Sequence, residues 1–133
     1  HAELSASQVK NIFEQNYINI VEPLDVPEVH FIQKSEILAD ITVLENGETR
    51  EVTGRGNGRL DAVTDALRIA TGKEFTIVTY TEHALEIGSK SKAMAYVGLA
   101  WQDGSVSWGA GQHTDIIVAR VAALVSAYNS KVT

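Results

Sequence analysis

The pattern of apolar and polar positions repeats once along this chain. Apolar residues alternate with polar or small residues over 37–44 and again over 93–101, and each stretch predicts a β-strand with one buried face. A shorter strand is predicted after each of them, at 49–53 and 105–108, and apolar residues at helical spacing follow. The chain therefore predicts two copies of one unit, which reads strand, hairpin, strand and helix.

A comparison of the sequence with itself supports this duplication. A shift of 57 residues without gaps superimposes identical residues, which are Gly47 and Gly104, Gly54 and Gly111, Ala62 and Ala119, Ala66 and Ala123, and Leu67 and Leu124. The pairs Asn46-Gly47 and Asp103-Gly104 both predict type I′ hairpin turns, because these residues tolerate positive φ. Two copies are too few for a solenoid, so we predict one globule built from two halves.

The residues before the repeat predict a short helix and a connector. The stretch Ser5–Gln8 matches a capping box, and apolar residues follow it at helical spacing, which predicts a helix over 6–16. Pro23 and Pro27 then predict a connector, because proline fits neither a helix interior nor a central strand. We therefore expect an N-terminal helix and linker over 1–27.

Each repeat is predicted to begin with one further strand. Residues 29–32 and 75–81 are rich in the β-branched and aromatic residues that favour strands. The predicted fold is α+β, with two pseudo-symmetric βββα units of antiparallel sheet and helix over 28–133, divided into repeats 28–72 and 73–133. One helix cannot cover the apolar sheet face of its unit, so we expect the units to pair and a homodimer to bury more.

Composition narrows the classes of function. The 133 residues carry a net charge of −6 with both signs interspersed, which disfavours nucleic acid and anionic membranes as partners. No apolar run approaches the ~18 residues that span a bilayer. The absence of cysteine excludes thiolate sites and disulfides and fits a cytoplasmic location. Because His1 stands where an initiating Met would be, we expect the chain to be a piece of a longer polypeptide.

The glycine-rich stretch 54–58 is the main candidate site. Glycines let a backbone approach a ligand closely, and N–H groups at a helix start favour a carboxylate or phosphate. The alternative is a strand-to-helix corner that needs positive φ. Asp61, in the first turn of the helix, could receive an ammonium group, so the corner is suited to a zwitterion. Leu60, Ala84 and Ala93 would line a small apolar pocket.

Few other residues suggest chemistry. By strict alternation Tyr80 lies on the opposite strand face from Ile77, and it is either a core residue or a hydrogen-bonding group for a ligand. Glu82-His83 and His113-x-Asp115 resemble acid–base or metal pairs, but neither has the spacing of a known metal motif. We predict no metal site and no catalytic residue; a small enzyme that uses one of these pairs is the alternative.

Three motifs in order resemble the C-terminal regulatory domain of the 2-isopropylmalate synthase and citramalate synthase family. The first is Gly-Asn-Gly-Arg-Leu-Asp-Ala at 56–62, at a helix start. The second is Tyr-Thr-Glu-His-Ala at 80–84 with the small-residue strand 93–96, and the third is Gly-Ala-Gly at 109–111 before Asp-Ile. The resemblance covers 29–129. It implies a dimeric domain that binds leucine or isoleucine and inhibits a TIM-barrel catalytic domain of the same polypeptide.

The resemblance also implies which residues bind the effector. Full-length members condense acetyl-CoA with a 2-oxo acid on a divalent metal, in a barrel for which this chain has no room, so we expect this chain to catalyse nothing and to hold no cofactor. By position, the pocket would comprise Gly56, Asn57, Gly58, Leu60, Asp61, Ile77, Tyr80, Ala84, Ser91 and Ala93, with Ala110 and Gln112 as further candidates. We predict a leucine sensor; an isoleucine sensor and a ligand-free dimerisation module are the alternatives.

Overall fold

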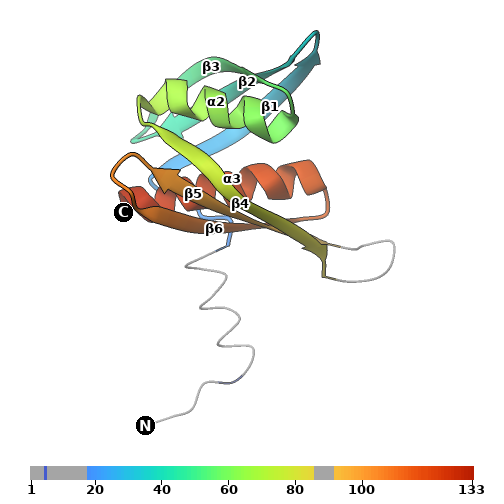
Figure 1. The fold of residues 1–133 in the computed structure, drawn as a ribbon, viewed down its shortest axis with the longest axis vertical. Helices are drawn as coiled ribbons and strands as arrows, with labels where there is room; N and C mark the ends of the chain where they lie inside the picture. Colours follow the sequence, from blue (N-terminus) through green and yellow to red (C-terminus); the bar gives the residue numbers. More distant parts are fainter. Residues whose placement is uncertain (1–4, 6–17, 86–91) are drawn as a thin grey trace.

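The computed structural model describes Ser5 and residues 18–85 and 92–133 of the chain. These residues form β1 Leu24–Gln33, β2 Ile37–Glu45, β3 Glu48–Gly56, α2 Arg59–Thr71, β4 Phe75–Ala84, β5 Ala93–Trp101, β6 Val106–His113 and α3 Ile116–Val132 (Figure 1). The order is βββα twice, as the duplicated pattern predicts. The helix predicted over 6–16 lies outside the described residues.

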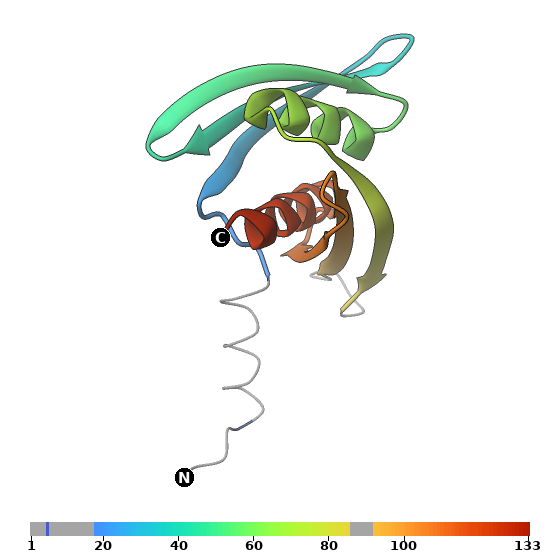
Figure 2. The same ribbon diagram turned by 60° about the vertical axis from the view of Figure 1, so that its left-hand side comes forward.

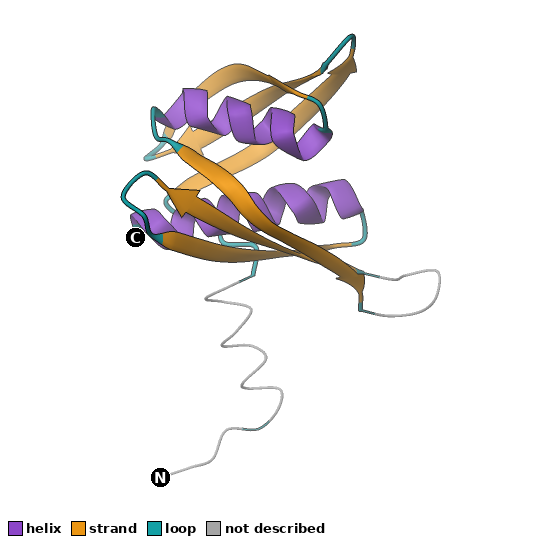
Figure 3. Cartoon of the chain, viewed as in Figure 1, coloured by secondary structure: helices purple, strands orange, loops and turns teal. Residues whose placement is uncertain are grey.

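Each half forms its own antiparallel sheet, with the strands in sequence order. The first sheet is β1-β2-β3 and the second is β4-β5-β6. α2 packs on the first sheet and α3 on the second, and both helices lie between the two sheets (Figures 2 and 3). Ile41, Leu67, Val97 and Leu124, one from a strand and one from the helix of each half, are buried in one continuous apolar core. The predicted α+β fold is confirmed, and its two halves share that core.

The two predicted hairpins form, but their turns differ. Asn46 and Gly47 both have positive φ, 54° and 79°, as a type I′ turn requires. In the second hairpin Gly104 has a φ of 87°, whereas the residue before it does not have positive φ. The Gly104 N–H donates to the Trp101 carbonyl, and the Trp101 N–H donates to the Ser105 carbonyl. This is a type I turn followed by a left-handed glycine, so the type I′ prediction was wrong for the second hairpin.

Two glycines that lie beyond the predicted strands 49–53 and 105–108 belong to strands instead. Gly54 belongs to β3 and Gly111 to β6, and neither has positive φ. A Cβ added at Gly54 would lie 2.2 Å from the Ala66 nitrogen, and one at Gly111 would lie 2.0 Å from the Ala119 oxygen. The missing side chains therefore let each helix rest directly on its sheet. The interpretation as a corner with positive φ was wrong, because close packing of the helix requires these glycines.

β1 begins earlier than the sequence predicts. It starts at Leu24 rather than Val29, and it includes Pro27. A proline fits here because β1 is an edge strand and its pairing with β2 is irregular between Asp25 and Glu28. The first strand therefore begins inside the stretch that was predicted as a connector.

One buried side chain attaches the start of β1 to α3. Asn129 is fully buried, and its Oδ1 accepts a hydrogen bond from the Leu24 N–H at 3.0 Å. Its Nδ2 donates to the carbonyls of Ile20 and Leu24, both at 2.8 Å. The Ser126 hydroxyl adds a bond from the Ile20 N–H at 2.7 Å. These bonds join the first half to the helix of the second half.

Candidate functional site

The glycine-rich corner leads directly into α2. Gly58 is the N-cap, with φ −128° and ψ 168°, and no side chain caps this helix start. Asp61 lies exposed beside the glycines: a Cβ on Gly58 would lie 3.4 Å from the Asp61 Oδ2, and one on Gly56 would lie 2.7 Å from the Asp61 Cβ. The structure therefore brings Gly56, Gly58 and Asp61 together at a helix N-terminus that lacks a capping side chain.

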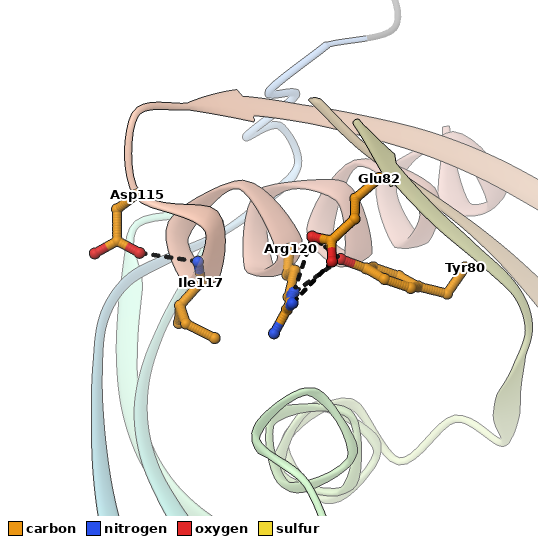
Figure 4. Close-up of polar contacts among 5 residues, drawn as sticks. All are labelled: Tyr80, Glu82, Asp115, Ile117 and Arg120. Atoms are coloured by element: carbon orange, nitrogen blue, oxygen red, sulfur yellow. Dashed lines mark hydrogen bonds and ion pairs between the residues drawn. The ribbon is translucent and has the colours of Figure 1, made fainter. Parts of the chain in front are cut away.

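The corresponding corner of the second half carries its own carboxylate. Asp115 is the N-cap of α3, and its Oδ1 accepts the Ile117 N–H at 2.9 Å (Figure 4). The His113 Nδ1 accepts the Asp115 N–H at 2.9 Å. The 57-residue shift places Asp115 opposite Gly58. The repeat thus holds a protein carboxylate at the start of α3, where α2 has a glycine.

Three polar side chains connect β4 to α3, and we call them the Tyr80 cluster. The Tyr80 hydroxyl donates to the Glu82 Oε2 at 2.8 Å and accepts from the Arg120 Nε at 2.8 Å (Figure 4). The Arg120 Nη2 forms an ion pair with the Glu82 Oε1 at 3.0 Å. Sequence reasoning identified Tyr80 but missed Arg120, because the two lie 40 residues apart and no local motif contains both.

A bulge in β4 decides which way Tyr80 points. Ile77 pairs with Leu99 and Tyr80 pairs with Val97, so the register shifts at Val78. Leu99 and Val97 both face the buried core, and Ile77 and Tyr80 therefore lie on the same face of the sheet. The prediction from strict alternation, which placed them on opposite faces, was wrong because one extra residue resets the alternation.

The other residues predicted near the α2 corner lie on the inner side of the fold or beside the corner. Leu60 and Ile77 are half-buried and pack against the shared core, as Tyr80 does. Asn57 is exposed between the two corner glycines. Ser91 lies outside the described residues. Ile77 and Tyr80 therefore share the inner side of β4, and Asn57 and Leu60 lie at the start of α2.

The remaining candidates lie elsewhere. Ala84 pairs with Ala93 where β4 ends, and Ala84 is exposed. Ala110 is buried on the other face of the second sheet, in a small cluster with Ile18. Gln112 follows it in β6, and its N–H donates to an asparagine of the preceding segment. The structure does not bring Ala110 and Gln112 to the α2 corner.

A cleft that sequence reasoning missed lies between β1 and α3. Its volume is about 830 Å³, and its lining includes Val29, Phe31 and Ile117, with Arg59 placed 5.7 Å from the Phe31 ring centroid. Asp115 also lines the cleft, and its carboxylate already accepts a hydrogen bond from the Ile117 N–H at the start of α3. The cleft is therefore not equivalent to the α2 corner as a carboxylate site.

The residues considered for enzyme chemistry are engaged in structural contacts. Glu82 bonds to the Tyr80 cluster on the inner face, whereas the His83 ring stacks on Tyr96 at 5.6 Å. Asp115 caps α3. Within 18–85 and 92–133, no group of three or more His, Cys, Asp or Glu is placed to hold a metal ion. Neither helix of the described part is long and apolar enough to cross a membrane.

The hydrogen bonds of the Tyr80 cluster predict how stability responds to acid. The Arg120 guanidinium, and then the Tyr80 hydroxyl, hold the pKa of Glu82 below its ordinary value. Because folding lowers this pKa, the stabilisation is present above the ordinary glutamate pKa and is lost as pH falls through the folded value. The Glu82 side chain is 35% exposed, so solvent screening limits the contribution.

We expect Glu82→Gln to lower the free energy of unfolding by about 0.5 kcal/mol at pH 7 and to have almost no effect at pH 3. Urea unfolding at the two pH values measures the difference. Glu74→Gln, at an exposed carboxylate in the loop before β4, is the control and should change little at either pH. An equal loss at pH 3 and pH 7 would contradict the assignment of this stabilisation to the ion pair.

The comparisons with known proteins decide the family. Residues 3–132 match the family model described as the LeuA allosteric (dimerisation) domain. The chain belongs to this family. It is 42% identical over 132 residues to the 2-isopropylmalate synthase of Desulfitobacterium hafniense (strain Y51), which covers 99% of this chain and 24% of that protein. It is 38% identical over 138 residues to the 2-isopropylmalate synthase of Helicobacter hepaticus. That match covers 97% of this chain and 25% of the relative.

The LeuA allosteric domain therefore accounts for nearly the whole chain. A further relative, the 2-isopropylmalate synthase of Thermobifida fusca (strain YX), is 36% identical over 132 residues, and the match covers 22% of that protein. The chain spans about a quarter of the length of the curated relatives it matches. The resemblance drawn from the glycine corner and the Tyr80 motif is confirmed. This chain is a regulatory domain of the 2-isopropylmalate synthase type.

Proposed function

We propose that this domain senses leucine at the start of α2 and transmits its binding as feedback inhibition to a TIM-barrel catalytic domain of the same polypeptide. That domain would condense acetyl-CoA with a 2-oxo acid on a divalent metal. One observation supports the proposal most directly. Asp115 places a carboxylate at the start of α3, whereas Gly58 leaves the equivalent position of α2 without a capping side chain. A ligand carboxylate would cap the start of α2 as the Asp115 carboxylate caps the start of α3.

The neighbours of this position suit the rest of an amino acid. Asp61 is exposed in the first turn of α2 and would receive the ammonium group. Leu60 and Ile77 are half-buried apolar residues that would contact a branched side chain. The N–H groups at the start of α2 and the Asp61 carboxylate would together select a zwitterion over a simple carboxylate. The apolar residues would select an aliphatic side chain.

Leucine is favoured over isoleucine by the comparisons. The relatives that match nearly the whole chain are 2-isopropylmalate synthases by name, and leucine is the end product that such enzymes would sense. An apolar pocket by itself separates these two amino acids weakly, since a single methylene is worth only ~1–3 kcal/mol. A panel of branched-chain amino acids therefore tests both the site and its selectivity.

Inhibition adds a requirement to binding. Leucine must bind one arrangement of the domain, or of its dimer, more tightly than another, because a ligand with equal affinity for both shifts no equilibrium. The Tyr80 cluster and the α2 corner belong to different halves of the fold, and the two halves share one core. A ligand that contacts both would therefore favour one arrangement of β4 relative to α2.

Leucine should raise the melting temperature of the folded domain. At a concentration of 100 times its Kd it would add about 2.7 kcal/mol, or roughly 10 °C for a domain of this size. Gly58→Ser should abolish this shift while the domain stays folded, because a serine N-cap would occupy the N–H groups that the ligand needs. Serine fits, since Gly58 has an extended backbone and a Cβ there meets only the Asp61 Oδ2 at 3.4 Å.

Asp115→Ala is the matched control. It removes the cap of α3 and should lower the stability of the domain by about 1 kcal/mol, but it should leave the leucine shift in place. A folded wild-type domain that shows no shift with millimolar leucine, isoleucine or valine would refute the sensor and favour a structural dimerisation module. A Gly58→Ser domain that still responds to leucine would place the ligand elsewhere.

A further inference from the structure

The chain contains the pair Asn-Gly twice, at 46–47 and at 57–58. Such a pair can react with itself, because a glycine has no side chain to keep its nitrogen away from the side-chain carbonyl of the preceding asparagine. The fold places the two pairs differently. The first is the tip of the hairpin between β2 and β3, and the second joins the end of β3 at Gly56 to the start of α2 at Arg59 (Figure 1).

Neither reacting group of the second pair is engaged. Asn57 is exposed and lies outside strands and helices. In the described part of the chain, neither the Asn57 side chain nor the Gly58 N–H makes a hydrogen bond. Only the carbonyl of Gly58 is used, as the acceptor of the Ala62 N–H at 3.0 Å. No hydrogen bond therefore has to break before the glycine nitrogen approaches the side-chain amide.

The charges around Asn57 favour this reaction. The glycine nitrogen attacks after it has lost its proton, so negative charge develops at the nitrogen and then at the amide oxygen. The N-terminus of α2 carries a partial positive charge that stabilises an anion. Arg55 and Arg59 are exposed on either side of the pair and add positive charge. Asp61, in the first turn of α2, provides the opposing carboxylate.

The hairpin pair is the internal comparison. Asn46 and Gly47 have φ of 54° and 79°, and they lie between Glu45 and Glu48, which pair with each other across the hairpin. To bring the Gly47 nitrogen to the Asn46 side chain, the backbone between them must rotate out of the type I′ turn. The two flanking glutamates also disfavour an anion. The fold therefore favours reaction at Asn57 over reaction at Asn46.

We propose that Asn57 is a site of spontaneous deamidation through a cyclic imide with Gly58. The Gly58 nitrogen gives its proton to a solvent base and forms a bond to the Asn57 Cγ. The bond from Cγ to the amide nitrogen breaks, and that nitrogen leaves as ammonia after it takes a proton from solvent. Water then adds to either imide carbonyl and opens the ring, which gives aspartate or isoaspartate at position 57. The reaction consumes only water.

The consequence for sensing rests on the proposed leucine site. Either product places a carboxylate beside the N–H groups at the start of α2, where the ligand carboxylate would bind. The new charge would repel that carboxylate, and we expect the leucine Kd to rise by about 10-fold. Deamidation would thus weaken the sensor while the domain stays folded.

Peptide mapping by mass spectrometry tests the reaction. In the folded chain at mildly alkaline pH, Asn57 should convert at least about 5-fold faster than Asn46, which corresponds to the charge effect of a helix end. In urea the two pairs should convert at similar rates, because the fold no longer distinguishes them. Gly58→Ala is the control: its Cβ meets only the Asp61 Oδ2 at 3.4 Å, so the domain folds, but the methyl group should slow conversion at Asn57 and not at Asn46.

The proposal is overturned if Asn57 in the folded chain converts no faster than Asn46, including the case in which neither converts. Calorimetry with leucine on the wild type and on Asn57→Asp tests the consequence separately. If both bind leucine with the same Kd, the effect on sensing is refuted. A folded wild type that binds no leucine refutes the sensor itself, and the rates of deamidation still decide the modification site.

Discussion

Gly111→Ala should lower the free energy of unfolding by about 3 kcal/mol, one of the largest effects expected of a single methyl group. A Cβ at this position would lie 2.0 Å from the Ala119 oxygen and 2.5 Å from the Ala123 nitrogen. Both are backbone atoms of α3, so no side-chain rotation can relieve the contact. The helix would have to move away from β6 and open the core beneath it. Urea unfolding followed by far-UV circular dichroism measures the loss.

Two other glycine-to-alanine substitutions serve as comparisons, one at the equivalent position of the first repeat and one at the α2 corner. Gly54→Ala should cost a similar amount, because its Cβ would lie 2.2 Å from the Ala66 nitrogen in α2. Gly58→Ala should cost much less, since its Cβ meets only a carboxylate oxygen of Asp61 at 3.4 Å. If Gly111→Ala unfolds at the same urea concentration as the wild type, α3 does not rest on β6 as described.

Asn129→Ala is expected to have a comparable effect for a different reason. The side chain makes three hydrogen bonds, one from the Leu24 N–H and two to the carbonyls of Ile20 and Leu24. Alanine would leave these backbone groups without partners in a buried position, at a cost of about 3 kcal/mol. Amide hydrogen exchange of residues 20–24 should rise together with the loss of stability.

Ser126→Ala separates this effect from a general loss of packing. Ser126 contributes one bond to the same segment, from the Ile20 N–H, so its removal should cost about 1 kcal/mol and leave the Leu24 amide protected. If Asn129→Ala changes stability without faster exchange at Leu24, the buried amide does not hold β1 to α3. The loss would then come from packing within α3 alone.

The local signals of the sequence predicted the local structure well. The Asn46-Gly47 pair forms the expected turn because both residues adopt positive φ, a property of the residues themselves. Gly72 ends α2 in the left-handed conformation, with φ 69°, and its N–H donates to the Arg68 carbonyl. Each of these features depends on residues within a few positions of one another. The βββα repeat followed for the same reason.

The errors concern contacts between distant segments. Gly54 and Gly111 lie beyond the predicted strands, but their role depends on a helix that follows in the chain and folds back on the strand. The direction of Tyr80 depends on a single bulge, which leaves no clear mark in the sequence. Its partner Arg120 comes from another element, and nothing near Tyr80 indicates it.

The sequence by itself determined that this chain forms two βββα units, and its motifs indicated a regulatory domain of the LeuA family. It also placed Gly58 and Asp61 at the start of a helix, because the glycine break, the apolar spacing and the acidic first turn are neighbours in the chain. Only the tertiary structure decided which way Tyr80 points and why Gly54 and Gly111 carry no side chain. These depend on how elements far apart in sequence pack, and burial and hydrogen bonding then act between residues that no local pattern connects.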